Sequence, residues 1–190
     1  MRLFIAIVPP PAAVDELEAA AAQLRPAWPQ LRWTRHDAWH VTLAFLGEVD
    51  EVVSNRLAPR LERAAGRHPS LSLAFNGAGA FPGGVKARVL WTGLRGDRRG
   101  LAALAASVAA GARRAGAPSA NEGRRFQPHI TLARCRAPAD VRPLVEALVS
   151  YAGTPWTAER IHLIRSHLGG RQPPRYETVA SWVLRGQEPV

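Results

Sequence analysis

One five-residue pattern occurs twice in this chain, and it constrains the fold more than any other feature. The segment His40-Val41-Thr42-Leu43-Ala44 recurs, with one conservative change, as His129-Ile130-Thr131-Leu132-Ala133. Two distant segments that share a histidine, a threonine and the same apolar frame are rarely a coincidence. Both copies contain β-branched residues, which favours a strand over a helix.

Strand geometry predicts how the residues of each copy divide between two faces. Side chains alternate along a strand, so residues two positions apart point the same way. His40, Thr42 and Ala44 are therefore expected on one face, and the residues between them, continuing to Phe45, on the opposite face toward a core. The second copy predicts the same division around His129. Each strand would carry one imidazole and one hydroxyl on its polar side.

A single histidine beside a threonine is usually a half-buried side chain, but a duplicated pair favours a two-fold-like site. A neutral imidazole accepts a proton from an attacking oxygen, and a protonated one donates a proton to a leaving oxygen. Threonine hydroxyls donate hydrogen bonds to phosphate oxygens. We therefore expect His40 and His129 to be catalytic in phosphoryl chemistry, and Thr42 and Thr131 to bind the substrate.

A metal site is the weaker interpretation of the two histidines. Structural zinc takes four nitrogen or sulfur ligands and catalytic zinc usually three protein ligands. The chain has one cysteine, Cys135, and no His-Glu-x-x-His pattern. The sequence therefore predicts a site without a metal or another cofactor.

The motifs and their surroundings resemble the 2H phosphoesterases, which carry His-x-Thr twice. Arg2–Ile7 followed by two prolines resembles the opening strand of that family, and Arg88–Trp91 its middle strand. Trp39–Val49 and Phe126–Arg134 are similar to the two motif segments of bacterial RNA 2′,3′-cyclic phosphodiesterases, also called 2′-5′ RNA ligases. The resemblance covers nearly the whole chain, with the motifs in the expected order.

The resemblance implies hydrolysis of 2′,3′-cyclic phosphates on RNA or nucleosides to 2′-phosphomonoesters, without a metal. It implies that His40 is the proton donor and His129 the acceptor. The residues alone do not assign these roles, because the two copies are nearly symmetric. Two alternatives stay open: ligation of RNA ends to a 2′-5′ linkage by the reverse reaction, and a nucleotide- or RNA-binding module without turnover.

Composition agrees with an anionic partner and a protein outside the membrane. Lysine and arginine exceed aspartate and glutamate by 25 to 15, a net charge of +10, and Lys86 is the only lysine. This charge balance suits RNA as a partner. The preference for arginine over lysine also follows from a GC-rich genome. The solitary cysteine excludes a disulfide framework, and the apolar run Leu3–Val8 is too short for a signal peptide or a membrane span. We expect a cytoplasmic monomer.

The order of helical and strand patterns predicts the architecture. Expected strands cover residues 3–8, 31–35, 38–46, 71–75, 87–93, 128–133, 156–164 and 176–184. Expected helices cover 11–24, 50–65 and 140–149, with another that begins after Asp97; loops cover 77–84 and 113–125. Asp50 and Asp97 are the expected helix caps. We expect an α+β fold within one domain, 1–190, of two similar lobes of antiparallel sheet with outer helices around a central groove, the second half of the chain echoing the first.

Three further positions are secondary candidates for the site. Arg134 follows the second motif; strict alternation turns it away from His129, and it reaches a bound phosphate only if the strand ends or bulges there. Phe45 is expected to pack in the core rather than to stack on a base. Tyr176 and the turn 169–171 are candidates for the rim, but an ordinary surface position is the favoured interpretation for each. The remaining histidines are expected to be structural or exposed: His36, His68, His162 and His167.

Overall fold

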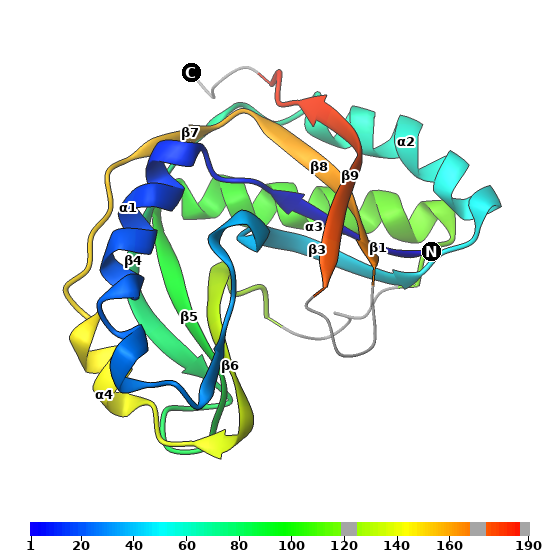
Figure 1. The fold of residues 1–190 in the computed structure, drawn as a ribbon. Coiled ribbons are helices and arrows are strands. Elements are labelled where there is room, and N and C mark those ends of the chain that lie inside the picture. Colours follow the sequence, from blue (N-terminus) through cyan, green and yellow to red (C-terminus); the bar gives the residue numbers. More distant parts are fainter. Residues whose placement is uncertain (119–124, 168–173, 187–190) are drawn as a thin grey trace.

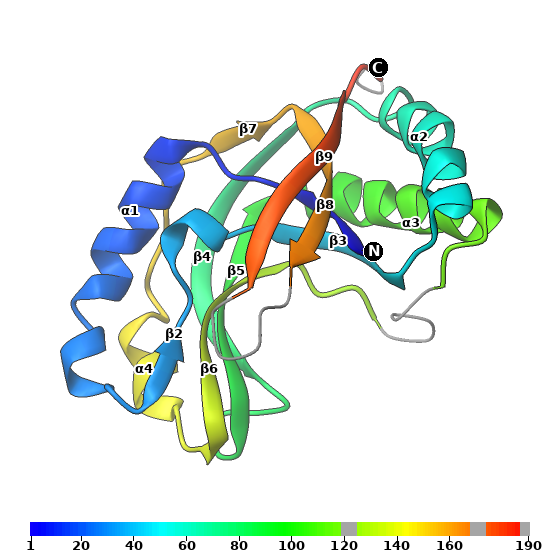
Figure 2. The same ribbon diagram turned by 45° about the vertical axis from the view of Figure 1, so that its right-hand side comes forward.

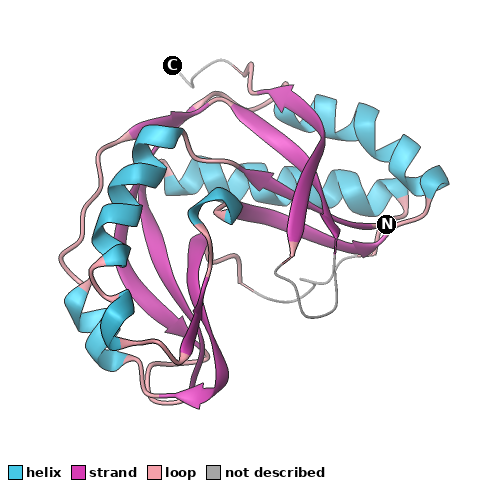
Figure 3. Cartoon of the chain, viewed as in Figure 1, coloured by secondary structure: helices cyan, strands magenta, loops and turns pink. Residues whose placement is uncertain are grey.

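Two antiparallel sheets form two lobes and confirm the expected α+β fold (Figures 1 and 3). The computed structural model describes residues 1–118, 125–167 and 174–186; the expected turn at 169–171 lies outside them. The first sheet has the order β3 (Val41–Glu48), β1 (Arg2–Ile7), β8 (Arg160–His167) and β9 (Arg175–Val183). The second has the order β2 (Leu31–Trp33), β6 (His129–Ala139), β5 (Ala87–Gly96), β4 (Leu71–Phe81) and β7 (Trp156–Ala158).

Within the described residues, four α-helices pack against the two lobes. The third of them also lines the cavity between the lobes and is not only an outer helix as expected. The helices are α1 (Pro11–Ala22), α2 (Glu51–Ala65), α3 (Arg98–Ala115) and α4 (Arg142–Ala147). Helices α1 and α4 contact β4 of the second sheet (Figures 1 and 2). Helices α2 and α3 pack on each other; α2 contacts β9 and α3 contacts β3 of the first sheet. Short 3-10 turns at Arg25–Ala27 and His36–Ala38 connect α1 to β2 and β2 to β3.

The lobes do not correspond to the two halves of the sequence, which corrects the expectation that the second half echoes the first. Both ends of the chain build the first sheet, and its middle builds most of the second. The reason is β1, whose residues from Leu3 to Ile7 are buried. A buried strand needs a hydrogen-bonding partner on each edge, and β1 obtains these from β3 on one side and β8 on the other.

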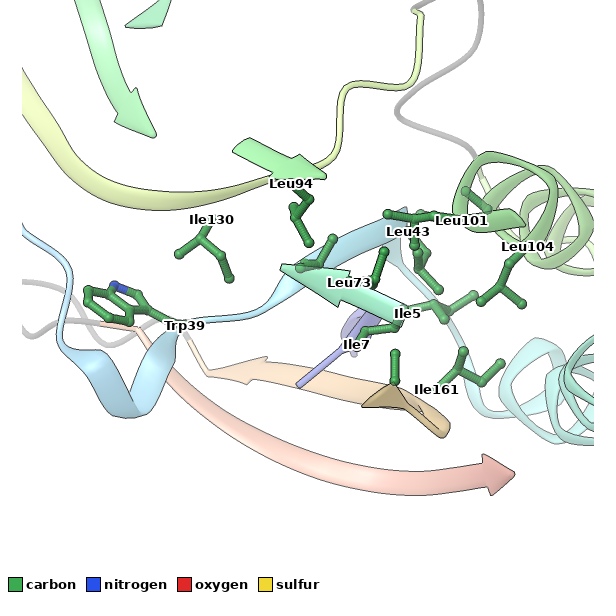
Figure 4. Packing of buried hydrophobic residues seen from close by; sticks show 14 of the residues in the cluster. Ile5, Ile7, Trp39, Leu43, Leu73, Leu94, Leu101, Leu104, Ile130 and Ile161 are labelled. Atoms are coloured by element: carbon green, nitrogen blue, oxygen red, sulfur yellow. The ribbon is translucent and has the colours of Figure 1, made fainter. Parts of the chain in front are cut away.

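One hydrophobic core runs between the two sheets. Figure 4 shows Ile5 and Leu43 of the first sheet, Leu94 and Ile130 of the second and Leu104 of α3 in the same cluster. All five side chains are at most 5% exposed. The inner faces of the sheets therefore bury each other's apolar residues, and this contact sets the position of one lobe against the other.

The two predicted helix caps differ in the structure. The Asp50 carboxylate accepts a hydrogen bond of 2.7 Å from the Val53 amide, as a helix cap does. Asp97 precedes α3 but makes no such bond to the helix. Its carboxylate accepts from the Ser72 amide at 2.8 Å instead, so it connects the end of β5 to the start of β4.

Some elements have different bounds from those expected. Strand β4 continues to Phe81 through residues 77–81, where a glycine-rich loop was expected, and pairs there with β5. The expected strand at 156–164 is two strands, β7 and β8, which belong to different sheets. Small residues account for the first difference, because a side chain at Gly79 would overlap the Trp91 ring on β5. Within the described residues, no helix is long and apolar enough to cross a membrane.

Candidate active site

The first motif strand contains a β-bulge directly after its threonine. Thr42 lies opposite Ala6 and Ala44 lies opposite Ile5 on β1, so that Leu43 is an extra residue in β3. A bulge places two residues opposite one and shifts the alternation of side chains by one position. Ala44 and Phe45 lie between this bulge and a second one at Leu46, so both point to the face opposite to the one that a regular strand predicts.

The second motif strand has the same bulge at the equivalent residue. Thr131 lies opposite Trp91 and Ala133 lies opposite Leu90 on β5, so that Leu132 is the extra residue in β6. Leu132 and Ala133 are both 0% exposed. The repeated pentapeptide thus adopts a repeated backbone irregularity as well as a repeated placement of histidine and threonine.

The bulges overturn two predictions that rested on strict alternation. Phe45 does not enter the core: it is 40% exposed and lies on the same face as His40 and Thr42. Ala44 does not share that face, because it is buried opposite Ile5. In both cases the extra residue before Ala44 shifts the phase of the strand.

Arg134 occupies the position in the second copy that Phe45 occupies in the first. The bulge in β6 satisfies the condition under which this side chain reaches the site, and Arg134 lines the same cavity as the two motifs. The two copies therefore differ on the groove face at one position, with an aromatic ring in one and a guanidinium in the other. This difference gives a nearly symmetric site two distinct ends.

All five predicted site residues meet at one cavity of about 980 Å³ between the lobes. His40, Thr42, His129, Thr131 and Arg134 line its walls. Both histidines and both threonines are half-buried. The sequence prediction that two distant strands turn their polar sides toward one cleft therefore agrees with the structure.

The two imidazoles are held in the same way by backbone carbonyls. Nδ1 of His40 lies 2.8 Å from the carbonyl oxygen of Ala38, and Nδ1 of His129 lies 2.7 Å from that of Gln127. A carbonyl only accepts, so Nδ1 carries the hydrogen in both rings. The other nitrogen, Nε2, is then free to exchange a proton with a bound molecule.

Aromatic rings support each histidine. The His40 ring lies 4.6 Å from Phe4 and 5.0 Å from Tyr176, measured between ring centroids. The His129 ring lies 5.0 Å from Phe81 and 6.1 Å from Trp91. Phe4 on β1 and Trp91 on β5 come from strands that pair with the motif strands, whereas Phe81 comes from β4 and Tyr176 from β9, which lie further from the motif strand in each sheet. These contacts restrict the orientation of both imidazoles.

Burial favours the uncharged form of both rings in the free protein. It lowers the pKa of His40 to about 4, against an opposing effect of the Ala38 carbonyl and with smaller contributions from the positive charges of His129 and Arg134. Burial also lowers the pKa of His129, and Arg134 adds to this shift. An anion bound between the rings would favour their protonated forms.

Tyr176 belongs to the site, which overturns its interpretation as an ordinary surface residue. It is half-buried and lines the cavity beside His40. Burial raises the pKa of its phenol, while the charges of Arg134 and Arg2 lower it. Tyrosine was not singled out by any motif, because β9 reaches the site only through the pairing of the C-terminal strands with β1.

The other histidines stay outside the cavity, as the sequence predicted for residues without the His-x-Thr pattern. His162 contacts the Ser181 hydroxyl at 2.7 Å, and His167 contacts the Glu177 carboxylate at 2.7 Å. His68 contacts the Ser107 hydroxyl at 2.8 Å. In the part of the chain that the structure describes, no three histidine, cysteine or acidic side chains gather as metal ligands.

Several contributors to the site were missed by reasoning from the sequence. Phe4, Phe81 and Trp91 touch the histidines but resemble ordinary strand residues in the sequence. The carbonyls of Ala38 and Gln127 have no side-chain signature at all. Their shared position, two residues before each histidine, is the one signal in the sequence that indicates this contact.

Comparisons with known proteins agree with the geometry. The family model described as the 2′-5′ RNA ligase superfamily matches residues 9–170. An RNA 2′,3′-cyclic phosphodiesterase of Escherichia coli is 36% identical over 151 residues, which cover 78% of this chain and 77% of that protein. A protein of the same name from Thermus thermophilus is 31% identical over 193 residues and covers 98% and 92% of the two chains.

Solved structures extend the similarity to the whole fold. E. coli LigT in its apo form superposes with a TM-score of 0.76 at 31% identity and covers 98% of each chain. LigT has also been solved with 3′-AMP and with ATP. A further relative, the RNA 2′,3′-cyclic phosphodiesterase of Geobacillus stearothermophilus, is longer, and this chain spans 57% of its length. With a family match over most of its length and a shared fold, the chain belongs to the 2′-5′ RNA ligase superfamily.

Proposed function

We propose that this protein hydrolyses 2′,3′-cyclic phosphates at the ends of RNA, or on nucleotides, to 2′-phosphomonoesters. The observation that carries the proposal is the paired geometry of the histidines: each donates Nδ1–H to a carbonyl, and both share one cavity. The names of the relatives point to the same reaction, and the LigT complexes with nucleotides support a nucleotide or RNA ligand.

The reaction needs one proton acceptor and one proton donor. Nε2 of His129 takes a proton from water as the water oxygen bonds to phosphorus. The bond from phosphorus to the ribose 3′ oxygen breaks, and Nε2 of His40, which begins protonated, gives that oxygen its proton. The product has a 2′-phosphate and a free 3′-hydroxyl. The family resemblance supplies this assignment of roles, since the geometry of the two histidines is nearly equivalent.

The other polar side chains of the cavity would act on the phosphate. Thr42 and Thr131 supply one hydroxyl donor beside each histidine, aimed at the oxygens that carry charge in the transition state. Arg134 adds a guanidinium, which pairs with phosphate through two hydrogen bonds. These groups supply positive potential without a metal ion.

The direct test is product analysis on a nucleoside 2′,3′-cyclic phosphate. We expect the wild-type protein to release the 2′-monophosphate, and the variants His40→Ala and His129→Ala to lose about 10²–10⁴-fold in kcat, because each removes one proton-transfer group. His162→Ala is the matched control, since that ring lies outside the cavity. EDTA should leave the rate unchanged.

Three results would contradict the proposal. The first is full activity in either histidine variant, and the second is loss of activity with EDTA that zinc restores. The third is tight binding of a 2′-phosphate nucleotide with no turnover of the cyclic phosphate, which would identify a binding module.

Ligation is the second candidate, because the matching family is described by that activity. In the reverse reaction a 5′-hydroxyl of a second RNA replaces water and forms a 2′-5′ linkage. Incubation of RNA ending in a 2′,3′-cyclic phosphate with 5′-hydroxyl RNA separates the two activities by product. We also propose that the protein works as a monomer in the cytoplasm, a prediction from composition that size-exclusion chromatography and cell fractionation would test.

A further inference from the structure

A second cavity of about 500 Å³ adjoins the catalytic one. The two cavities share four lining residues, among them Thr131, Arg134 and Tyr176. Beyond these, the second cavity extends to β2 and the turn that follows it, where Arg32 and Trp33 line its wall. No part of the proposed hydrolysis of a mononucleotide uses this space.

Two arginines of the second cavity lie directly opposite each other. Arg32 on β2 and Arg134 on β6 are partners in the antiparallel register, so their side chains leave the same face of the sheet. Like charges in this arrangement repel and destabilise a sheet. Both arginines line the second cavity, and neither has a carboxylate within ion-pair distance among the described residues. An anion between them would relieve the repulsion.

The wider charge balance of the cavity also favours an anion. Two more arginines, Arg35 and Arg175, line it, against a single acidic residue, Asp37, among the lining residues that the structure describes. Asp37 already pairs with Arg35 at 2.6 Å, and Arg175 interacts with the charge of Glu177, which leaves Arg32 and Arg134 without a counter-charge among the described lining residues. Trp33 and Tyr176 add aromatic walls. Arginines interleaved with aromatic rings are typical of sites for single-stranded nucleic acid.

The chemistry of the substrate determines which phosphate could reach this cavity. A 2′,3′-cyclic phosphate closes the end of a strand, so the RNA continues from its terminal nucleoside only through the 5′ oxygen. The next anionic group along the chain is the phosphodiester on that 5′ side. Arg134 lines both cavities, so it lies between the positions for the cyclic phosphate and for its neighbour.

We propose that the second cavity binds the phosphodiester immediately 5′ of the terminal nucleoside, between Arg32 and Arg134. This inference rests on the proposed function and specifies its substrate as an RNA end rather than a free nucleotide. The enzyme then binds an RNA end that continues on the 5′ side of the terminal nucleoside more tightly than it binds a mononucleotide. A mononucleotide fills only the catalytic cavity.

The test compares a dinucleotide that ends in a 2′-phosphate with the corresponding nucleoside 2′-phosphate by isothermal titration calorimetry. The wild-type protein should bind the dinucleotide about 10-fold more tightly, because one charge-assisted contact is added. Its affinity should also depend more steeply on salt, by a slope of about 0.7 for one further phosphate of a single strand. Arg32→Ser should abolish both differences, and Arg32→Lys should retain part of each.

Arg88→Ser is the matched control, because it removes an arginine from β5 of the same sheet, and this residue lines neither cavity. It should bind both ligands as the wild type does. Equal wild-type affinities for the two ligands would overturn the subsite, as would an equal loss for both in Arg32→Ser. The calorimetry needs no turnover, so it decides the subsite even if cyclic phosphates are not hydrolysed, a result that would refute only the proposed function.

Discussion

A hydrogen bond to the backbone two residues earlier is shared by both histidines, and it decides which ring nitrogen can react. The Ala38 and Gln127 carbonyls fix Nδ1 as the protonated nitrogen. Nε2 is then the proton acceptor in the neutral ring and a donor once the ring is protonated. At this scale the site is symmetric, and its function depends on one ring gaining a proton that the other lacks.

The hydroxyl of Thr42 is expected to contribute to turnover rather than to folding. Thr42→Val keeps the branched shape of a half-buried side chain but removes the donor to phosphate. We expect kcat on a 2′,3′-cyclic nucleotide to fall about 10²-fold, with the melting temperature nearly unchanged. Steady-state kinetics and thermal unfolding check both statements, and unchanged kinetics would remove this threonine from the phosphate site.

The lowered pKa values predict the pH dependence of catalysis. In the free protein both histidines lose their protons below their ordinary pKa of 6.5, and His40 does so at about 4. Because one ring must be protonated, kcat/KM should be bell-shaped with its maximum on the acid side of pH 6.5 and should fall as pH rises. The anionic substrate favours the protonated ring, so the maximum of kcat should lie at higher pH.

A pH series of kcat and of kcat/KM measures this separation. The two histidines titrate as a coupled pair, so the two limbs of the bell-shaped pH profile report pKa values of the pair and not of either ring alone. Each single histidine variant should lose one limb of the residual profile. Identical maxima for the two parameters would show that substrate binding does not change the protonation of the site.

At the scale of elements, two bulges determine which side chains join the site. If the two motif strands kept Leu43 and Leu132 but paired regularly, without the bulges, Phe45 would point into the core and Arg134 away from the cavity. The neighbouring strands then complete each histidine's surroundings with aromatic rings. The packing of β4 against β5 is an example, since the absence of a side chain at Gly79 leaves room for Trp91.

Gly79→Ala is expected to disturb catalysis through the support of His129. An added methyl group would overlap the Trp91 ring, which must shift and thereby alter its contact with His129. We expect a decrease in kcat of about 10-fold or more, because small misplacements of a catalytic group are costly. Kinetics on a cyclic nucleotide measures the loss.

Gly83→Ala provides the control for this prediction. Gly83 lies in the connection between the same two strands, and a methyl group there would meet no other atom within 4 Å. Its activity should match that of the wild type. Equal activities of the Gly79 and Gly83 variants would mean that the Trp91 ring does not position His129.

At the scale of the whole molecule, one core joins the lobes and holds the two motif strands across the cavity. We propose that residues 1–190 unfold as one bilobal domain, because Leu43, Leu104 and Ile130 from three different elements share that core. The separation of the histidines is then a property of the core, not of either sheet alone.

Leu104→Ala tests whether the two lobes unfold together. The side chain is fully buried, and its truncation should lower the free energy of unfolding by about 2–5 kcal/mol. Far-ultraviolet circular dichroism and tryptophan fluorescence should shift together, in a single transition, in both the wild type and the variant. Two separate transitions would indicate lobes that fold independently.

Local patterns were sufficient for most of the fold. The apolar periodicity of residues 11–24 and 50–65 predicted α1 and α2, and Asp50 is a helix cap as expected. The repeated pentapeptide was sufficient to name His40 and His129, because histidine and threonine two apart share a face of any extended strand. These predictions depend on neighbouring residues along the chain, which the sequence contains in full.

Only the tertiary structure decided the rest. The bulges arise where each motif strand meets its partner, so the positions of Phe45 and Arg134 depended on β1 and β5 rather than on the motifs. Tyr176 entered the site because β9 joins the sheet of β1 through β8. Arg32 lies opposite Arg134 because β2 pairs with β6. The sequence of either segment alone does not indicate which distant strand it pairs with.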